Sequence, residues 1–138
     1  MVAFIARKPS NTDPASGDIL IFQNEELDTS GAYDITSGKF TAPNAGVYLF
    51  SVQMCVRDDS GIFYQIRSSL SRKSHIQSFH GGNYKDSECS SATTVARLAQ
   101  HEEVWVESGS TVGNSNEIYI NEMAWNMFTG ILVSPSKP

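Results

Sequence analysis

The feature that most constrains the fold is a regular alternation of side chains over residues 46–56. Successive side chains of an extended chain point to opposite faces. One face of this segment carries Tyr48, Phe50, Val52 and Met54. The other face carries Val47, Leu49, Ser51, Gln53 and Cys55. One wholly apolar face and one mixed face indicate a long strand inside a sandwich, with a mixed face able to meet a second surface.

Short apolar or β-branched runs make up much of the remaining chain. Strand-like segments lie at residues 2–6, 19–23, 62–70, 75–80, 92–98, 103–107, 118–120 and 127–133. Polar stretches lie between them, the longest at residues 24–36, 81–91 and 109–116. No amphipathic helix, internal repeat or domain boundary is evident. About ten short strands with frequent turns predict an all-β fold, an antiparallel sandwich or jelly roll, in a single domain over residues 1–138.

The composition excludes several classes of protein. With 138 residues, 40% of them hydrophobic and 18% charged, the chain has the balance of a folded domain. The net charge is −5, and the nearest approach to a basic stripe is Arg72-Lys73, so nucleic acid is a poor candidate partner. No apolar run is long enough to cross a bilayer. The N-terminus lacks the pattern of a signal peptide, so we expect a mature form, or one with an added Met1, if the protein is secreted.

Catalysis has little support in the sequence. The three histidines are His75, His80 and His101, and none belongs to a recognisable hydrolase, metalloprotease or nucleotide-binding motif. We therefore expect no enzymatic activity. The two cysteines, Cys55 and Cys89, are too few for a disulfide-dense scaffold or a cysteine-only zinc site. They are compatible with one disulfide or with two buried thiols.

Three ordered blocks of sequence resemble the globular head of the complement C1q family. The first consists of Tyr33, Asp34, residues 38–41, Pro43, residues 46–48 and Phe50. The second is Leu98 followed by residues 102–106, which resembles the family's block ending in Val-Trp. The third is residues 128–132, Phe-Thr-Gly-Ile-Leu, which resembles the family's closing strand. The resemblance covers nearly the whole chain, residues 2–135.

This resemblance implies a ten-stranded antiparallel jelly roll, shared with the tumour necrosis factor family, that assembles as a homotrimer. The family builds its trimer mainly from the sheet that holds the first, long central and last strands. For this chain we expect Phe4, Tyr48, Phe50 and Phe128 at the trimer interface, while the alternative is that they are only core residues of one subunit. Since no Gly-x-y repeat is present, the chain resembles head-only members such as those of bivalve molluscs, or a head from a longer protein.

The resemblance also bears on the cysteines. In the family, the strand that ends at Cys55 and the strand that follows Cys89 are antiparallel neighbours. The end of one therefore lies near the start of the other, which makes a disulfide between Cys55 and Cys89 geometrically plausible. Two free buried thiols remain the alternative.

Some family members bind Ca²⁺ through two acidic residues, eight apart, near the trimer apex. The equivalent positions here are His80 and Glu88. Because Ca²⁺ requires several hard oxygen ligands, the histidine weakens this site, although Asp86 is able to compensate. A calcium site at Glu88 and Asp86 is one expectation, and an ordinary solvated loop is the preferred one.

The same region offers candidate ligand-binding residues. Arg72, Lys73, His75, His80 and Tyr84 are cationic, polar or aromatic and lie close in sequence. Tyrosine faces suit sugars, and the cations suit sialic acid, phosphate or sulfate. His75 and His80 are able to make binding pH-dependent. The alternative for each residue is an exposed loop position without a ligand.

These observations favour a secreted, extracellular, non-enzymatic recognition protein. Its expected partners are itself, as a homotrimer, and microbial or self surface ligands such as glycans or charged patterns, bound in lectin-like fashion in innate immunity. The alternative is a signalling ligand, of the hormone or synaptic-organiser type, that clusters a protein receptor. A matrix or shell component has no residue-level support.

Overall fold

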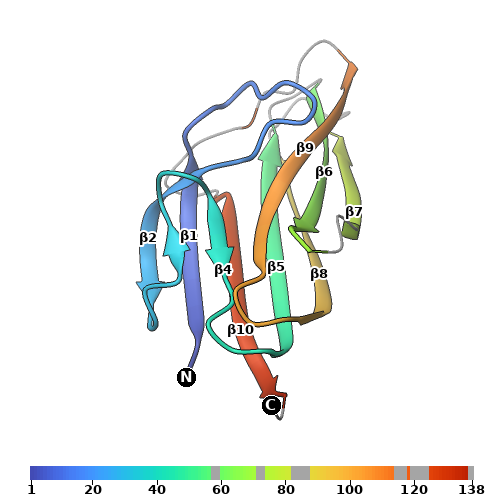
Figure 1. Cartoon of the computed structure of the whole chain (residues 1–138). Helices are drawn as coiled ribbons and strands as arrows, with labels where there is room; N and C mark the ends of the chain where they lie inside the picture. Colours follow the sequence, from blue (N-terminus) through green and yellow to red (C-terminus); the bar gives the residue numbers. More distant parts are fainter. Residues whose placement is uncertain (57–59, 71–73, 82–87, 114–117, 119–124, 137–138) are drawn as a thin grey trace.

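A computed structural model describes residues 1–56, 60–70, 74–81, 88–113, 118 and 125–136 (Figure 1). The strands are β1 (Ala3–Pro9), β2 (Phe22–Asp28), β3 (Tyr33–Asp34), β4 (Lys39–Thr41), β5 (Gly46–Val56), β6 (Ser60–Ser68), β7 (Ser74–Gly81), β8 (Glu88–Leu98), β9 (Glu103–Gly113) and β10 (Met127–Pro135). The described residues contain no helix, so none of them forms a helix able to span a membrane. The predicted all-β class is confirmed.

The strands form two five-stranded antiparallel sheets that face each other (Figure 1). The first, sheet A, has the order β2-β1-β10-β5-β8, and the second, sheet B, has the order β3-β4-β9-β6-β7. Neighbours in space are often distant in sequence, as with β1 and β10, which is the pattern of a jelly roll. The start of β1 and the end of β10 lie at the same end of the sandwich.

The long strand β5 has the predicted limits and the predicted faces. Tyr48, Phe50, Val52 and Met54 are all fully buried. It lies between β10 and the edge strand β8 in sheet A, and pairs with β8 along its whole length. Burial of one complete face fixes the register of such a strand, because a slip of one residue would expose every aromatic side chain.

The second strand differs from the prediction for residues 19–23. Strand β2 begins at Phe22 and continues through polar residues to Asp28, because it is an edge strand that pairs with β1 through backbone groups and leaves most of its side chains in solvent. Ile19 belongs to the other sheet, where it forms an isolated bridge with Glu107. The Leu20 backbone N–H donates to the Val106 carbonyl at 2.8 Å.

Strands β8 and β9 are longer than their apolar content predicted. Strand β8 begins at Glu88, inside an expected loop, because β5 supplies backbone partners from Gly46 to Val56. Strand β9 likewise continues to Gly113, opposite Ser60 of β6. The short apolar segment predicted around residue 118 contributes, in its described part, an isolated bridge between Ile118 and Val56.

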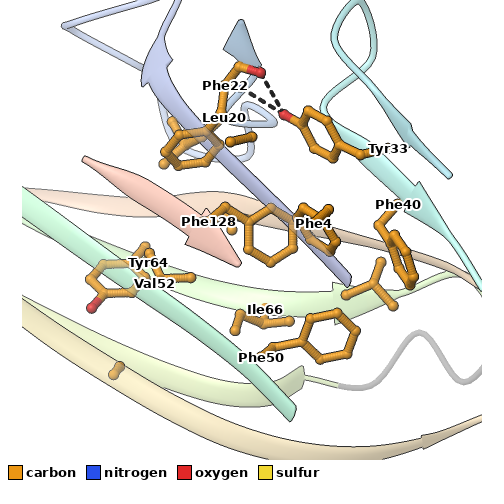
Figure 2. Packing of buried hydrophobic residues seen from close by; sticks show 14 of the residues in the cluster. Phe4, Leu20, Phe22, Tyr33, Phe40, Phe50, Val52, Tyr64, Ile66 and Phe128 are labelled. Carbon is orange, nitrogen blue, oxygen red and sulfur yellow. Dashed lines mark hydrogen bonds between the residues drawn. The ribbon is translucent and has the colours of Figure 1, made fainter. Parts of the chain in front are cut away.

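Aromatic rings fill the space between the sheets (Figure 2). Phe4 is central to the cluster: its ring stacks on Phe40, with centroids 4.8 Å apart, and meets Phe128 edge-on at 5.0 Å. The remaining aromatic members of the core cluster are Phe22, Tyr33, Tyr48, Phe50 and Tyr64. Stacked and edge-to-face pairs each add about 0.5–1.5 kcal/mol beyond the area that they bury.

This packing corrects the predicted trimer contacts. Phe4, Tyr48, Phe50 and Phe128 are each no more than 1% exposed within one chain. They therefore form the core of a subunit, which was the alternative interpretation. The periodicity of β5 correctly grouped its aromatic residues on one face and left the mixed face to meet a second surface.

Candidate binding surfaces

Cys55 and Cys89 are joined by a disulfide. They lie directly opposite each other on β5 and β8, so the bond ties the edge strand of sheet A to its neighbour. Cys55 is fully buried, and its backbone N–H donates to the Asn126 side-chain oxygen at 2.7 Å. That hydrogen bond holds the end of β5 on the side away from β8.

Strand β7 separates the residues predicted to bind a ligand. Arg72, Lys73 and Tyr84 lie outside the described residues. His75 is near the beginning of β7 and His80 near its end, five residues along an extended strand, a separation of about 17 Å. The two histidines are therefore not neighbours on this strand, and their role in ligand binding stays a prediction.

The His75 side chain is partly buried and has a defined environment. Its Nε2 atom lies 2.8 Å from the Ser68 hydroxyl, and the Thr94 hydroxyl donates to the His75 carbonyl at 3.0 Å. These contacts link β7 to β6 and β8. They are consistent with a structural role for His75, whose role in ligand binding stays a prediction.

The predicted calcium ligands lie mostly beyond what the structure describes. Asp86 is outside the described residues, while Glu88 is the first residue of β8, opposite Val56. The described residues contain no group of three or more histidine, cysteine, aspartate or glutamate residues arranged to hold a metal ion. The calcium site stays a prediction.

The outer face of sheet A carries a patch of exposed apolar side chains. Leu49 of β5 lies opposite Ile131 of β10 on one side and Val95 of β8 on the other. These three side chains are 36%, 38% and 59% exposed, respectively. Ile5 and Leu27 extend the patch and line a groove of about 400 Å³ with Leu49 and Ile131. We call these five residues the apolar patch.

A polar cluster borders the outer face of sheet A. The Arg7 guanidinium forms a 2.5 Å ion pair with Glu26 and lies 3.9 Å from the ring centroid of Trp125. The Gln53 amide donates to the Trp125 carbonyl at 2.8 Å. A polar rim around an apolar centre is the usual anatomy of a protein–protein contact.

The outer face of sheet B is different in character. The Glu107 carboxylate accepts hydrogen bonds from the amide of Gln65 at 3.1 Å, from Arg67 at 3.3 Å and from the Trp105 indole at 3.3 Å. Lys39 lies 4.9 Å from the ring centroid of Trp105. Glu107 thus has a full set of donors, which suits an anchor for surface side chains better than a general base. The sequence offered only the alternation around Trp105 as a signal for this network.

A hollow of about 280 Å³ lies beside this network. Its lining includes Phe63, Gln65, Gln77, Ser78 and Gly109. Phe63 is 39% exposed, although its neighbours Ile62 and Tyr64 are buried. An exposed aromatic ring beside two amide side chains combines apolar contact with hydrogen-bonding groups, as in many small-ligand sites.

The shifted pKa values of described residues have structural causes. Burial raises the pKa of Tyr33, Tyr48 and Tyr64. Hydrogen bonds from Thr36 lower the pKa of Asp34, and a hydrogen bond with Asp28 raises that of Glu25. Each cause is a packing or turn contact, and none of these five residues lines the hollow or the groove except Tyr64.

Comparison with known proteins gives consistent results. The sequence profile of the C1q domain matches residues 3–133. Complement C1q tumor necrosis factor-related protein 5 of Rattus norvegicus is 36% identical over 132 residues, which are 95% of this chain and 53% of that protein. The chain thus spans about half the length of this relative.

Solved structures share the fold. The globular domain of zebrafish complement 1qA protein superposes with a TM-score of 0.79 at 19% identity, covering 99% of this chain and all of that one. Murine APRIL, crystallised at pH 5.0, gives a TM-score of 0.71 at 12% identity, covering 96% of this chain and all of that one.

Proposed function

Because this chain belongs to the C1q domain family, we propose that it is a secreted, trimeric recognition protein, built from a single C1q domain, that binds surface ligands and catalyses no reaction. Its ligands would be microbial or self glycans, or charged surface patterns, in innate immunity. The following observations support this proposal.

The observation that carries the proposal is the apolar patch on sheet A. Leu49, Ile131 and Val95 form a row in register, at positions where solvent would favour polar side chains. Contiguous exposed apolar surface with a polar rim is typical of a protein–protein interface. A closed ring of three copies would bury such patches without leaving an open end for fibre growth. A trimer would also present three copies of the ligand site to one target surface.

The disulfide supports an extracellular location. Disulfides persist in oxidising compartments and are rare in the cytosol, where thiols are kept reduced. The Cys55–Cys89 bond therefore fits a protein that leaves the cell through a secretory route.

The polar outer face of sheet B supports binding rather than catalysis. The Glu107 carboxylate is engaged by three donors, and the neighbouring groups are amides and aromatic rings. Such groups recognise sugars by hydrogen bonding and apolar contact. Weak contacts of this kind gain strength when three copies engage one surface. The residues Arg72, Lys73, His80 and Tyr84 remain candidates for contacts with acidic glycans.

A glycan array and pull-down of fixed microbes test the proposal. The protein is first confirmed as a trimer in solution, and binding is then measured with Ca²⁺ and with a chelator, so that the predicted calcium site at Glu88 and Asp86 is tested as well. We expect binding to a defined set of glycans. A correctly trimeric protein that binds neither glycans nor microbes would overturn the proposal.

A signalling role is the second candidate. It is favoured by the 36% identity to a tumor necrosis factor-related protein of the rat. Here the trimer would cluster a protein receptor through the same polar surfaces. Binding to cells that survives enzymatic removal of their glycans would support this role, whereas binding lost with the glycans would support pattern recognition.

A further inference from the structure

We propose that the hollow between Phe63 and Gly109 on the outer face of sheet B binds one neutral sugar ring of a surface glycan. This inference rests on the proposed function, since it assigns that function to a definite place. The site lies on strands β6, β7 and β9, away from the apolar patch on sheet A.

A β-bulge forms the hollow. Ile62 pairs with Thr111 and Tyr64 pairs with Ser108, so residues 109–110 of β9 face the single residue Phe63 of β6. Bulges of this kind redirect side chains and are frequent beside functional sites. A methyl group on Gly109 would lie 2.8 Å from Cβ of Phe63, so the close approach of the two strands at the bulge requires glycine.

The lining supplies the two kinds of contact that a sugar requires. The exposed ring of Phe63 offers an apolar surface for the C–H face of a pyranose. Gln65 and Gln77 are directly opposite each other on β6 and β7, so their side chains leave the same face of the sheet. The Gln65 amide N–H₂ donates to Glu107, which fixes that side chain beside the hollow. The Gln77 side chain is exposed.

The electrostatics favour a neutral ligand. The Glu107 carboxylate, which binds Gln65 at the hollow, is 3.3 Å from the Arg67 guanidinium, so the two charges offset each other. Two amides are able both to donate to and to accept from hydroxyl groups. An acidic sugar would find no unpaired cation among the described lining residues.

The size of the hollow favours a single ring. Its volume of about 280 Å³ lies just below the range for small-ligand sites, roughly 300–1,000 Å³. It is bounded by one face of the sheet, so the rest of a polysaccharide is free to continue into solvent. A surface polymer with many identical rings is therefore better suited to this site than a free monosaccharide.

The test measures binding of the trimer to immobilised neutral polysaccharides, namely yeast mannan, chitin oligosaccharides and galactan, and to an acidic polysaccharide. Phe63→Ala should weaken binding to the neutral polymer by roughly tenfold, because the stacking surface is lost. Phe63→Trp should retain binding because an aromatic face remains. Gln77→Ala should weaken binding by about fivefold through loss of a hydrogen bond. Gln23→Ala, which removes an exposed amide on β2, is the matched control and should bind as the unmodified protein does.

The outcomes separate this inference from the proposed function. If the unmodified trimer binds glycans and Phe63→Ala and Gln77→Ala bind as tightly, the site assignment is wrong while pattern recognition stands. Exclusive binding to the acidic polysaccharide also contradicts the site and points to other residues. If the trimer binds no glycan at all, the proposed function fails and the site fails with it. Thermal unfolding of each variant verifies that the fold is intact.

Discussion

The hydroxyl of Tyr33 holds two segments of the chain together. It donates to the Phe22 carbonyl at 2.7 Å and accepts the Phe22 backbone N–H at 3.0 Å. Both groups lie in the interior, where water is not available to replace them. A buried hydroxyl with two backbone partners explains why a polar tyrosine serves at this position among phenylalanine rings.

Tyr33→Phe should therefore lower the free energy of unfolding by about 1–3 kcal/mol, since the Phe22 N–H and carbonyl would be left buried without partners. Urea unfolding monitored by circular dichroism measures the change. As a control, Phe22→Leu removes apolar packing but retains both hydrogen bonds. A stability unchanged by Tyr33→Phe would contradict the role given to this hydroxyl.

The same residue predicts behaviour at alkaline pH. Burial raises the pKa of Tyr33 in the folded protein above its ordinary value near 10. The neutral form is therefore favoured by folding, so its contribution is complete below pH 10 and is lost as the pH rises through the raised value. The folded protein should lose stability above about pH 10, and Tyr33→Phe should lose less. Identical alkaline profiles for the two proteins would refute this assignment.

Gly130 is explained by the rings around it. A methyl group at this position would lie 2.5 Å from the Phe4 ring and 2.8 Å from the Phe50 ring. Gly130→Ala should then destabilise the fold by about 1–3 kcal/mol through overpacking. Chemical denaturation measures this change, and Ser134→Ala at the exposed end of the same strand serves as a control. An alanine variant as stable as the original would show that the core has room that the structure does not indicate.

The sequence predicted some residue roles better than others. The alternation in β5 correctly grouped Tyr48 with Phe50, because side-chain period follows directly from extended geometry. It did not predict the network around Glu107, since Gln65, Arg67 and Trp105 meet across strands that are distant in sequence. It grouped His75 and His80 by their closeness in sequence and did not predict that they lie five residues apart along a single extended strand.

At the scale of elements, the disulfide fastens an exposed edge. Strand β8 has only one neighbour within its sheet, and the bond between Cys55 and Cys89 joins it to β5 near the beginning of β8. The sequence separation is 34 residues. Closing a loop of that length restricts the unfolded chain more than it restricts the folded one.

Replacing both cysteines with serine should lower the free energy of unfolding by about 3–4 kcal/mol in the chain-entropy model. Because β8 is an edge strand, its amide hydrogens should also exchange faster near residue 89 than near Leu98 at the other end. Hydrogen exchange and denaturant unfolding, each with and without reductant, measure these effects. A double variant as stable as the oxidised protein would contradict this account.

Strand limits were predictable only where apolar residues mark them. The predicted limits of β5 were correct because its apolar face is continuous. The predicted limits of β2 were wrong, since most of its residues are polar and its position is fixed by backbone pairing with β1. The sequence did not predict the beginning of β8 for the same reason. Because β5 extends to Val56, it supplies backbone partners for Glu88, Ser90 and Ser91. The β-propensity of the residues predicts the limits of a strand less well than the position of its partner strand does.

At the scale of the whole molecule, the apolar patch should control assembly. Leu49→Asp or Ile131→Asp would place a charge in the centre of the proposed contact between copies while leaving the core unchanged, since both side chains are exposed. Light scattering with size-exclusion chromatography should show a mass about threefold lower than that of the unmodified trimer. Leu70→Asp, at an exposed position outside the patch, should remain trimeric.

Assembly and recognition meet in one measurement: binding of the protein and of its Leu49→Asp variant to the same glycan-coated surface. If three weak sites act together on one surface, the unmodified trimer should bind at least about 100-fold more tightly than the monomeric variant. Circular dichroism should show the same fold in both. Equal binding by the two forms, or no binding by the trimer, would contradict multivalent surface recognition as the task of this protein.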